Sequence, residues 1–313
     1  MRAALLALAL ASTALTGCDI REALLPRLVA GQSKYLGPER FEGSEFQQIS
    51  DRVYAFRWRY YRNISIRTDE GWVVIDPLNA VAADLLAEHL SAVDPAAPVA
   101  ALIYSHYHLD HAVGGAALKP QRVIAHERSP SYWRDFPSNG VLQPTEFING
   151  DTTFDIGGVT IKAIYLENSH TDTLYAFHLP SDRMLFSVDM GLAKAFLPMG
   201  HPDSYGPGVI RALERLVAVD FDAFVPAHFD VGTKADLEEY LEFQKDVRRL
   251  AREALDLYGE ANGATLSGDS EALKEMFVYV YGPIKEKYGH WHGFDQQSLY
   301  IVFSNIVGEV LGF

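Results

Sequence analysis

The chain has 313 residues, of which 48% are hydrophobic and 12% aromatic, and its 27 basic and 41 acidic side chains give a net charge of −14 at pH 7. This composition predicts a globular protein with one large domain or two ordinary ones. The acidic balance argues against nucleic acid as the main partner, because phosphate binding needs clustered Lys and Arg. The single cysteine excludes an internal disulfide and a cysteine-rich zinc site. Any metal would therefore be bound by His, Asp and Glu.

The first 18 residues have the pattern of a secretory signal. Arg2 precedes an Ala/Leu run of about a dozen apolar residues, which is too short for a bilayer span of roughly 20. The following Leu-Thr-Gly-Cys ends at Cys18 and resembles a bacterial lipobox, which implies cleavage before Cys18 and lipidation of its sulfur. We therefore predict a signal peptide over residues 1–17, a tether over 18–44, and a protein of the bacterial cell envelope that is anchored by lipid and faces the periplasm or the exterior. An ordinary secretory peptide with an incidental cysteine is the alternative.

From Phe46 the chain has the pattern of strands that alternate with helices. Short β-branched and aromatic runs predict strands, and apolar residues at helical spacing predict helices. The predicted strands are 52–58, 63–68, 71–76, 99–104, 122–125, 152–156, 159–165, 174–179, 183–188 and 223–227. The predicted helices are 80–93, 114–118, 128–135 and 207–219, followed by an all-helical region with segments 234–259, 270–288 and 295–310. This order fits an α/β (α+β) architecture with helices on the outer faces of mixed sheets.

A dense polar cluster follows the apolar strand 99–104. Four residues with metal-binding side chains stand within six positions: His106, His108, Asp110 and His111. Imidazole and carboxylate suit zinc and its neighbours, and the alternate spacing of His106 and His108 points two rings to the same side of an extended segment. The cluster also follows the end of a strand, where α/β sheets place their ligands. It therefore predicts a metal site, against the alternative of a polar surface loop.

This cluster resembles the signature His-x-His-x-Asp-His of the metallo-β-lactamase superfamily. The other landmarks of that family also occur in order, each after a predicted strand: Asp76, His170, Asp189 and His228. The resemblance covers roughly residues 46–231 and implies an αββα sandwich with a binuclear site along one edge. We therefore predict a metallo-β-lactamase-fold domain over residues 45–232 and a helical extension over 233–313 packed on it.

The resemblance also implies a role for each landmark. It assigns a first metal ion to His106, His108 and His170, a second ion to Asp110, His111 and His228, and a bridge between the two ions to Asp189. Asp76 would brace the loop of His106 without binding metal, and Asp110 would also act in catalysis by orienting the nucleophile or passing a proton to the leaving group. Two zinc ions are expected, with iron or manganese as alternatives.

These roles predict a zinc-dependent hydrolase in which a metal-bridging hydroxide attacks an ester, lactone or related bond of a small-molecule substrate. The bridging carboxylate at Asp189 resembles the lactonase, thioesterase and phosphodiesterase branches of the superfamily. A β-lactamase and a phosphodiester or sulfate ester hydrolase are the alternatives. From another class, an iron-dependent oxidoreductase is compatible with the same ligands. A binding protein without turnover usually lacks ligands, and none is missing here.

Two regions beside the motifs have more than one interpretation. His201 follows the strand that precedes Asp189 and is a candidate substrate contact. Tyr60 and Tyr61 belong to an aromatic stripe that we interpret as a sheet face rather than as a ligand pocket. The local positive charge from Arg57 to Arg62 would attract either an anionic group of the substrate or a membrane surface.

Overall fold

The computed structural model describes residues 35–37, 41–136, 140–198, 204–259 and 270–312. The predicted signal peptide, Cys18 and His201 lie outside these ranges. The chain divides into two compact units. Phe41–Lys194 and Ser204–Gln244 form the first, which we call the sandwich unit. The second, which we call the helical unit, contains the described residues of Met1–Arg40, Ala195–Asp203 and Lys245–Phe313.

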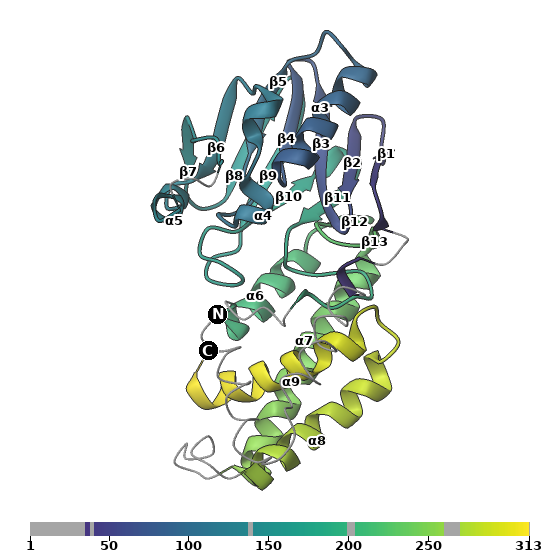
Figure 1. The fold of residues 1–313 in the computed structure, drawn as a ribbon, viewed down its shortest axis with the longest axis vertical. Helices are drawn as coiled ribbons and strands as arrows, with labels where there is room; N and C mark the ends of the chain where they lie inside the picture. The colour runs from purple at the N-terminus through teal and green to yellow at the C-terminus, as the bar shows by residue number, and fades with distance from the viewer. Residues whose placement is uncertain (1–34, 38–40, 137–139, 199–203, 260–269, 313) are drawn as a thin grey trace, which may run out of the picture. The chain divides into compact units, whose positions relative to one another are not determined.

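Two β-sheets make up most of the sandwich unit (Figure 1). The seven-stranded first sheet has the order β1 (Ser44–Gln48), β2 (Val53–Trp58), β3 (Tyr61–Thr68), β4 (Gly71–Ile75), β5 (Val99–Ile103), β6 (Arg122–His126) and β7 (Glu146–Ile148). The six-stranded second sheet has the order β13 (Gly232–Thr233), β12 (Ala223–Pro226), β11 (Met184–Ser187), β10 (Tyr175–Leu179), β9 (Val159–Tyr165) and β8 (Thr152–Ile156). Strands β4 to β7 pair in parallel, as do β11 and β12, and the other neighbours are antiparallel.

The described helices are α3 (Ala80–Val93), α4 (Leu109–Ala112), α5 (Ser129–Arg134), α6 (Gly206–Val217), α7 (Lys234–Tyr258), α8 (Ser270–Tyr288) and α9 (Phe294–Leu311). Two short 3₁₀ helices, η2 (Gly115–Leu118) and η3 (Pro180–Asp182), complete the set of described elements. Helix α7 begins in the sandwich unit and continues into the helical unit.

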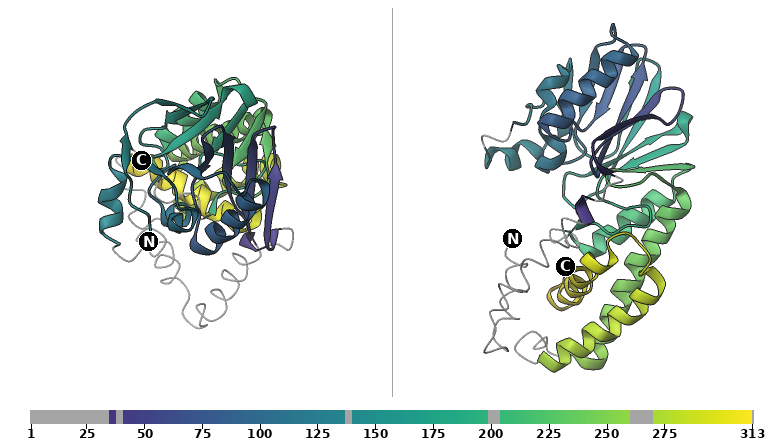
Figure 2. Two further views of the ribbon diagram at one scale, coloured as in Figure 1. Left: turned by 90° about the horizontal axis from the view of Figure 1, so that it is seen from above. Right: turned by 45° about the vertical axis from the view of Figure 1, so that its right-hand side comes forward.

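The first sheet has an apolar layer on each face. Trp72 and Val74 of β4 belong to a buried cluster that also contains Leu86 and Leu90 of α3. Figures 1 and 2 show α3 lying across this face of the sheet. Because side chains alternate along a strand, Val73 of β4 points to the opposite face, and it is fully buried as well. The sheet is therefore covered on both sides.

Helices α6 and α7 cover the second sheet. A Cβ atom added at Gly191 would lie 2.5 Å from Leu237 Cδ1, 3.5 Å from Phe224 Cζ and 3.6 Å from Leu213 Cδ2. These side chains belong to α7, β12 and α6 respectively, so both helices pack beside β12. The layers therefore run helix, sheet, sheet, helix, which confirms the predicted αββα sandwich.

Three short strands and one helix face differ from the sequence predictions. The patterns do not predict β1, β7 or β13, which contain five, three and two residues. Helix α3 has the predicted bounds, but Val81, expected on its apolar face, is 57% exposed, whereas Ala82 and Ala83 are buried. The two alanines therefore pack beside the sheet, where the apolar pattern predicted the larger side chain of Val81.

Ion pairs connect the helices of the helical unit. Arg248 Nε and Arg252 Nε of α7 each lie 2.7 Å from a carboxylate oxygen of Glu309 on α9. Asp246 of α7 binds Lys287 of α8 at 2.8 Å. Among the described residues after Thr233 the elements are the helices α7, α8 and α9, as predicted. In the described ranges no helix combines the length and the apolar character that a membrane crossing requires.

Candidate metal centre

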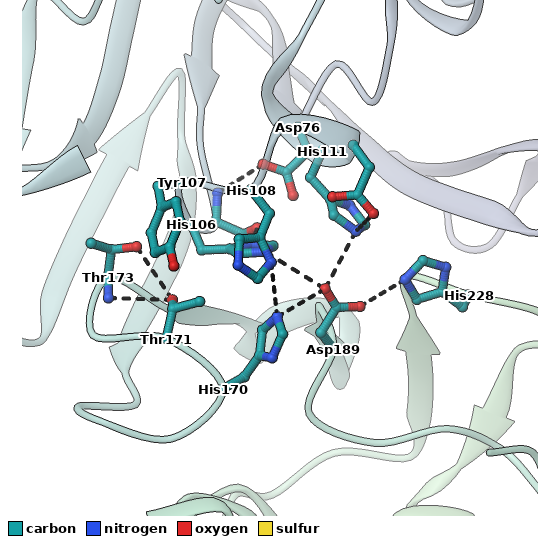
Figure 3. Close-up of polar contacts among 12 residues, drawn as sticks. Asp76, His106, Tyr107, His108, His111, His170, Thr171, Thr173, Asp189 and His228 are labelled. Carbon is teal, nitrogen blue, oxygen red and sulfur yellow. Dashed lines mark hydrogen bonds and ion pairs between the residues drawn. The ribbon is translucent and has the colours of Figure 1, made fainter. Parts of the chain in front are cut away.

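Polar side chains from both sheets meet at one edge of the sandwich unit (Figure 3). The first sheet contributes Asp76, directly after β4, and the cluster that follows β5. The second sheet contributes His170 from the loop between β9 and β10, Asp189 after β11, and His228 after β12. Because β4 and β5 run parallel, and β11 and β12 likewise, their carboxyl ends lie at the same edge of each sheet. The parallel pairs therefore bring together segments that are far apart in the sequence.

Asp76 supports the loop that carries the histidine cluster. Its Oδ1 accepts a hydrogen bond of 2.8 Å from the Ser105 N–H, and its backbone carbonyl accepts one of 2.5 Å from Asn63 Nδ2. Asp76 is fully buried and has a left-handed φ of 62°, which is unfavourable for a residue with a side chain. Burial raises the pKa of Asp76 to about 6, although His111 and Ser105 lower it. The contact with Ser105 agrees with a bracing role, which stays a prediction.

Four side chains form the first group of metal-binding atoms: His106, His108, His170 and Asp189. Their ligand atoms all lie within 4.8 Å of one another. His170 Nε2 is 3.1 Å from His108 Nδ1, and Asp189 Oδ2 is 3.4 Å from His170 Nε2. Asp189 Oδ2 is also 3.6 Å from His106 Nε2. These are the three histidines predicted for the first ion, together with the predicted bridge.

The second group consists of His111, Asp189 and His228. Asp189 Oδ1 lies 2.7 Å from His228 Nε2, and Oδ2 lies 3.4 Å from His111 Nε2. Figure 3 shows Asp189 between the two sets of imidazoles, with its carboxylate directed at both. Asp189 has a left-handed φ of 53°, which turns the chain sharply after β11. One carboxylate is therefore shared by both groups.

Asp110 lies beside the second group without belonging to either. Its Oδ2 is 3.7 Å from His111 Nε2, and its side chain is 49% exposed. The predicted roles of Asp110 in metal binding and in catalysis stay predictions. Its position at the open side of the centre gives its carboxylate access to both solvent and the ligands of the second group.

The buried ring nitrogens of this cluster are better suited to metal coordination than to hydrogen bonds with one another. His106 and His111 are 1% and 0% exposed, yet His106 Nε2 and both ring nitrogens of His111 have no hydrogen-bond partner among the described residues. An unpaired buried polar group costs about 1–3 kcal/mol. Coordination by imidazole and carboxylate, as zinc, iron and manganese accept it, would satisfy Nε2 of each ring, which lies within 3.6 Å of Asp189 Oδ2.

Burial and neighbouring charges shift the pKa values of the candidate ligands in opposite directions. Burial, reinforced by His108 and His111, lowers the pKa of His106 well below its ordinary value, so that its ring is neutral and ready to bind metal. Burial also lowers the pKa of His111, but Asp189 and Asp110 outweigh it and raise the pKa to about 9. Burial would raise the pKa of Asp189, but His111 and His228 hold it well below its usual range. Without metal, His111 is therefore protonated at neutral pH.

Metal binding at the second group should therefore release a proton from His111. We expect the number of protons released per bound zinc to decrease by on the order of one when the pH is raised from about 7.5 to about 10, because His111 has then already lost its proton. Isothermal titration calorimetry of the metal-free protein in buffers of different ionisation enthalpy measures this number. Proton release that stays constant across this range would contradict the charge assigned to His111.

Two sequence interpretations change beside the metal centre. Tyr60 and Tyr61, interpreted as part of a sheet face, contact the second group: the Tyr61 ring lies 5.0 Å from the ring of His228. No spacing signal indicates this, because the contact depends on an isolated bridge between Tyr61 and His228 that joins the two sheets. Arg57 and Arg62 are only 7% and 3% exposed, whereas Arg59 is exposed, so Arg59 alone of these three presents its charge at the surface.

The family model of the metallo-β-lactamase superfamily matches residues 63–228. This match covers more than half of the chain and all seven predicted ligands, and the chain therefore belongs to the metallo-β-lactamase superfamily. Family membership confirms the predicted superfamily and the predicted fold.

Solved structures of this fold resemble the chain to different extents. A metallo-β-lactamase from Pontibacter korlensis has 22% identity and a TM-score of 0.57, over 64% of this chain and 99% of that chain. A stereoselective inverting sec-alkylsulfatase from Pseudomonas sp. has 15% identity and a TM-score of 0.66, over 87% of this chain and 50% of that chain. At these identities the likeness shows the fold.

The sequence is also similar to the 2,4-dinitroanisole O-demethylase subunit alpha of Nocardioides sp. (strain JS1661). The two are 26% identical over 213 residues, which are 67% of this chain. The chain spans 65% of the length of that curated relative.

Proposed function

We propose that this protein is a zinc-dependent hydrolase that cleaves an ester, lactone or related carbon–oxygen bond of a small molecule. The observation that carries the proposal is the shared carboxylate of Asp189, which lies 2.7 Å from His228 on one oxygen and within 3.6 Å of three further histidines on the other. One carboxylate between two sets of imidazoles is the arrangement that holds two cations close together.

The ligands divide naturally between two ions. His106, His108 and His170 would hold the first, Asp110, His111 and His228 the second, and Asp189 both. When bound, the ions supply a nucleophilic hydroxide at neutral pH and stabilise the negative charge that develops on the substrate. The three neutral imidazoles add no charge of their own, so the shared Asp189 carboxylate alone offsets part of the charge of the first ion.

Asp110 would move the proton in this reaction. Hydrolysis joins the oxygen of water to the electrophilic carbon and breaks the carbon–oxygen bond, whose electron pair leaves with the departing oxygen. The exposed Asp110 carboxylate, 3.7 Å from His111 Nε2, accepts the proton of the nucleophile and delivers it to that oxygen. This assignment is part of the proposal.

Two of the similar proteins support a bond to oxygen over a β-lactam bond. A sec-alkylsulfatase and a 2,4-dinitroanisole O-demethylase are each named for removing a group from an oxygen atom. The likeness to the alkylsulfatase extends over 87% of this chain, whereas the likeness to the metallo-β-lactamase extends over 64%. The substrates to be tested therefore include sulfate esters and phosphodiesters as well as carboxylic esters and lactones. A β-lactam serves as the comparison.

The test combines metal removal with a panel of substrates. We expect the purified protein to hydrolyse at least one ester, lactone, thioester, sulfate ester or phosphodiester, to lose this activity when a chelator removes its metal, and to regain it with zinc. A colourless zinc protein agrees with hydrolysis, whereas iron with visible absorption would favour an oxidoreductase. A protein with both metal sites filled that hydrolyses none of these substrates would refute the proposal.

Two further assignments stand as proposals because their residues lie outside the described ranges. We propose that Cys18 carries a lipid anchor that tethers the protein to a membrane of the bacterial cell envelope, facing the periplasm or the exterior. We also propose that His201 contacts the substrate.

A further inference from the structure

The hairpin between β2 and β3 is attached directly to the segment that carries His228. The N–H of Phe229 donates a 2.9 Å hydrogen bond to the carbonyl of Tyr60, and the N–H of Arg62 donates one of 2.6 Å to the carbonyl of Ala227. An isolated β-bridge between Tyr61 and His228 lies between these two bonds. The backbone of the hairpin is therefore held in a defined position beside the second metal-binding group.

Two tyrosine rings contact the histidines of that group. The ring of Tyr61 lies 5.0 Å from the ring of His228 and 5.7 Å from that of His111. The ring of Tyr60 is 5.7 Å from that of His228 and only 4.3 Å from that of Tyr61. Both tyrosines are half-buried, so part of each side chain remains accessible at this edge of the sandwich unit.

The two hydroxyl groups form a pair near Asp110. The Tyr60 hydroxyl donates a 2.9 Å hydrogen bond to the Tyr61 hydroxyl. Burial raises the pKa of both tyrosines, and Asp110 is the charge that contributes most to the rise in each. Asp110, the carboxylate that we propose moves the proton, is therefore near enough for its charge to act on both hydroxyls.

The Tyr61 hydroxyl has a hydrogen atom left to donate. Its oxygen accepts the bond from Tyr60, and no acceptor for its own hydrogen is present among the described residues. A phenol hydrogen that the protein does not use is available to an oxygen atom of a ligand. The remaining question is which substrate oxygen comes within its reach.

We propose that Tyr61 binds the leaving-group oxygen of the substrate through its hydroxyl, and that Tyr60 is a positioning residue that directs this hydroxyl. The inference rests on the proposed function. As the carbon–oxygen bond breaks, the electron pair moves onto the leaving oxygen, and a hydrogen bond to that oxygen becomes stronger as its charge grows. Tyr61 keeps its proton throughout, because the proton that neutralises the leaving group comes from the attacking water through Asp110.

This role predicts a dependence on the leaving group. A weakly basic leaving oxygen, such as that of 4-nitrophenol, departs without help, whereas the more basic oxygen of phenol needs the hydrogen bond. Tyr61→Phe removes the hydroxyl and keeps the ring. We expect it to lower kcat by about tenfold or more for phenyl acetate, by much less for 4-nitrophenyl acetate, and to change KM little.

Two other variants separate this role from a structural one. Tyr60→Phe should have the same selective effect with a smaller magnitude, because the Tyr61 hydroxyl remains but is no longer directed. Tyr54→Phe removes a hydroxyl from β2, in a side chain that packs against Trp72 away from the histidines, and should leave both rates and the metal content unchanged. An equal loss by Tyr61→Phe on both esters, or a loss of bound metal, would indicate a structural role and overturn the proposal.

Binding of a product provides a readout without turnover. The 4-nitrophenolate ion, followed by its absorbance, should bind the zinc-loaded wild-type protein about five- to tenfold more tightly than the Tyr61→Phe variant. If the wild type hydrolyses neither ester, the proposed function fails for these esters, and this titration alone decides the role of Tyr61. Tighter binding by the wild type supports that role, and equal binding overturns it.

Discussion

Replacing Asp189 with Asn should reduce the bound metal from about two ions to one or fewer per chain and lower the hydrolytic rate by about a thousandfold or more. Asp189 is the only residue shared by the two groups of metal-binding atoms found in the described residues. Asn has nearly the same shape, but it lacks the negative charge and presents an NH₂ group where one carboxylate oxygen stood. At least one group of imidazoles therefore loses its anionic ligand. Elemental analysis together with steady-state kinetics measures both effects.

A second Asp-to-Asn change controls for the loss of charge. Asp220 of the sandwich unit is paired with Arg183 at 2.8 Å, and its side chain is 81% exposed. Exposed ion pairs contribute at most about 1 kcal/mol, so Asp220→Asn should keep the wild-type metal content and rate. An Asp189→Asn variant that still bound two ions and turned over normally would show that the shared carboxylate is not a metal bridge.

Replacing Asp76 with Ala should weaken metal binding by about 10- to 100-fold, although Asp76 belongs to neither group of ligands. The reason is its hydrogen bond to Ser105, the residue directly before His106. Without this acceptor the buried Ser105 N–H is left unpaired, which costs about 1–3 kcal/mol of folding free energy. Competition with a chromophoric chelator measures the affinity, and thermal unfolding of the metal-free protein measures the stability.

Asp76→Asn separates the hydrogen bond from the charge. It keeps an oxygen acceptor for Ser105 and removes a carboxylate whose ionised form is disfavoured by burial, as its raised pKa of about 6 shows. At about pH 7.5 the metal-free Asp76→Asn variant should therefore be at least as stable as the wild type. If Asp76→Ala matched the wild type in affinity and in melting temperature, the proposed bracing of the histidine loop would be wrong.

The candidate metal ligands could be predicted from the sequence because their motifs resemble those of a known family and each motif lies in a loop that follows a strand. Continuous apolar runs such as Val99–Ile103 indicate buried strands, and a polar residue that interrupts such a run stands where the strand ends. His106 and His228 are examples on different sheets. The resemblance to the metallo-β-lactamase superfamily then predicted which of these residues meet. The distances within each group required the structure.

Features that depend on contacts between distant segments could not be predicted. Tyr61 belongs to the centre only because the β2–β3 hairpin is bonded to the segment around His228, and neither segment has a pattern that indicates this pairing. Strand β1 is an exposed edge strand without apolar alternation, so its sequence resembles a lead-in. Arg62 has the composition of a surface residue but is 3% exposed, because its guanidinium donates to the carbonyl of Phe229.

Anomalous X-ray diffraction at the zinc absorption edge tests the central claim most directly, because it locates each ion and identifies its element. We expect two zinc peaks per chain, one bound by His106, His108 and His170, the other by Asp110, His111 and His228, with Asp189 in contact with both. A single peak in fully loaded protein, or two peaks that do not share Asp189, would contradict the binuclear hydrolase proposed for this chain.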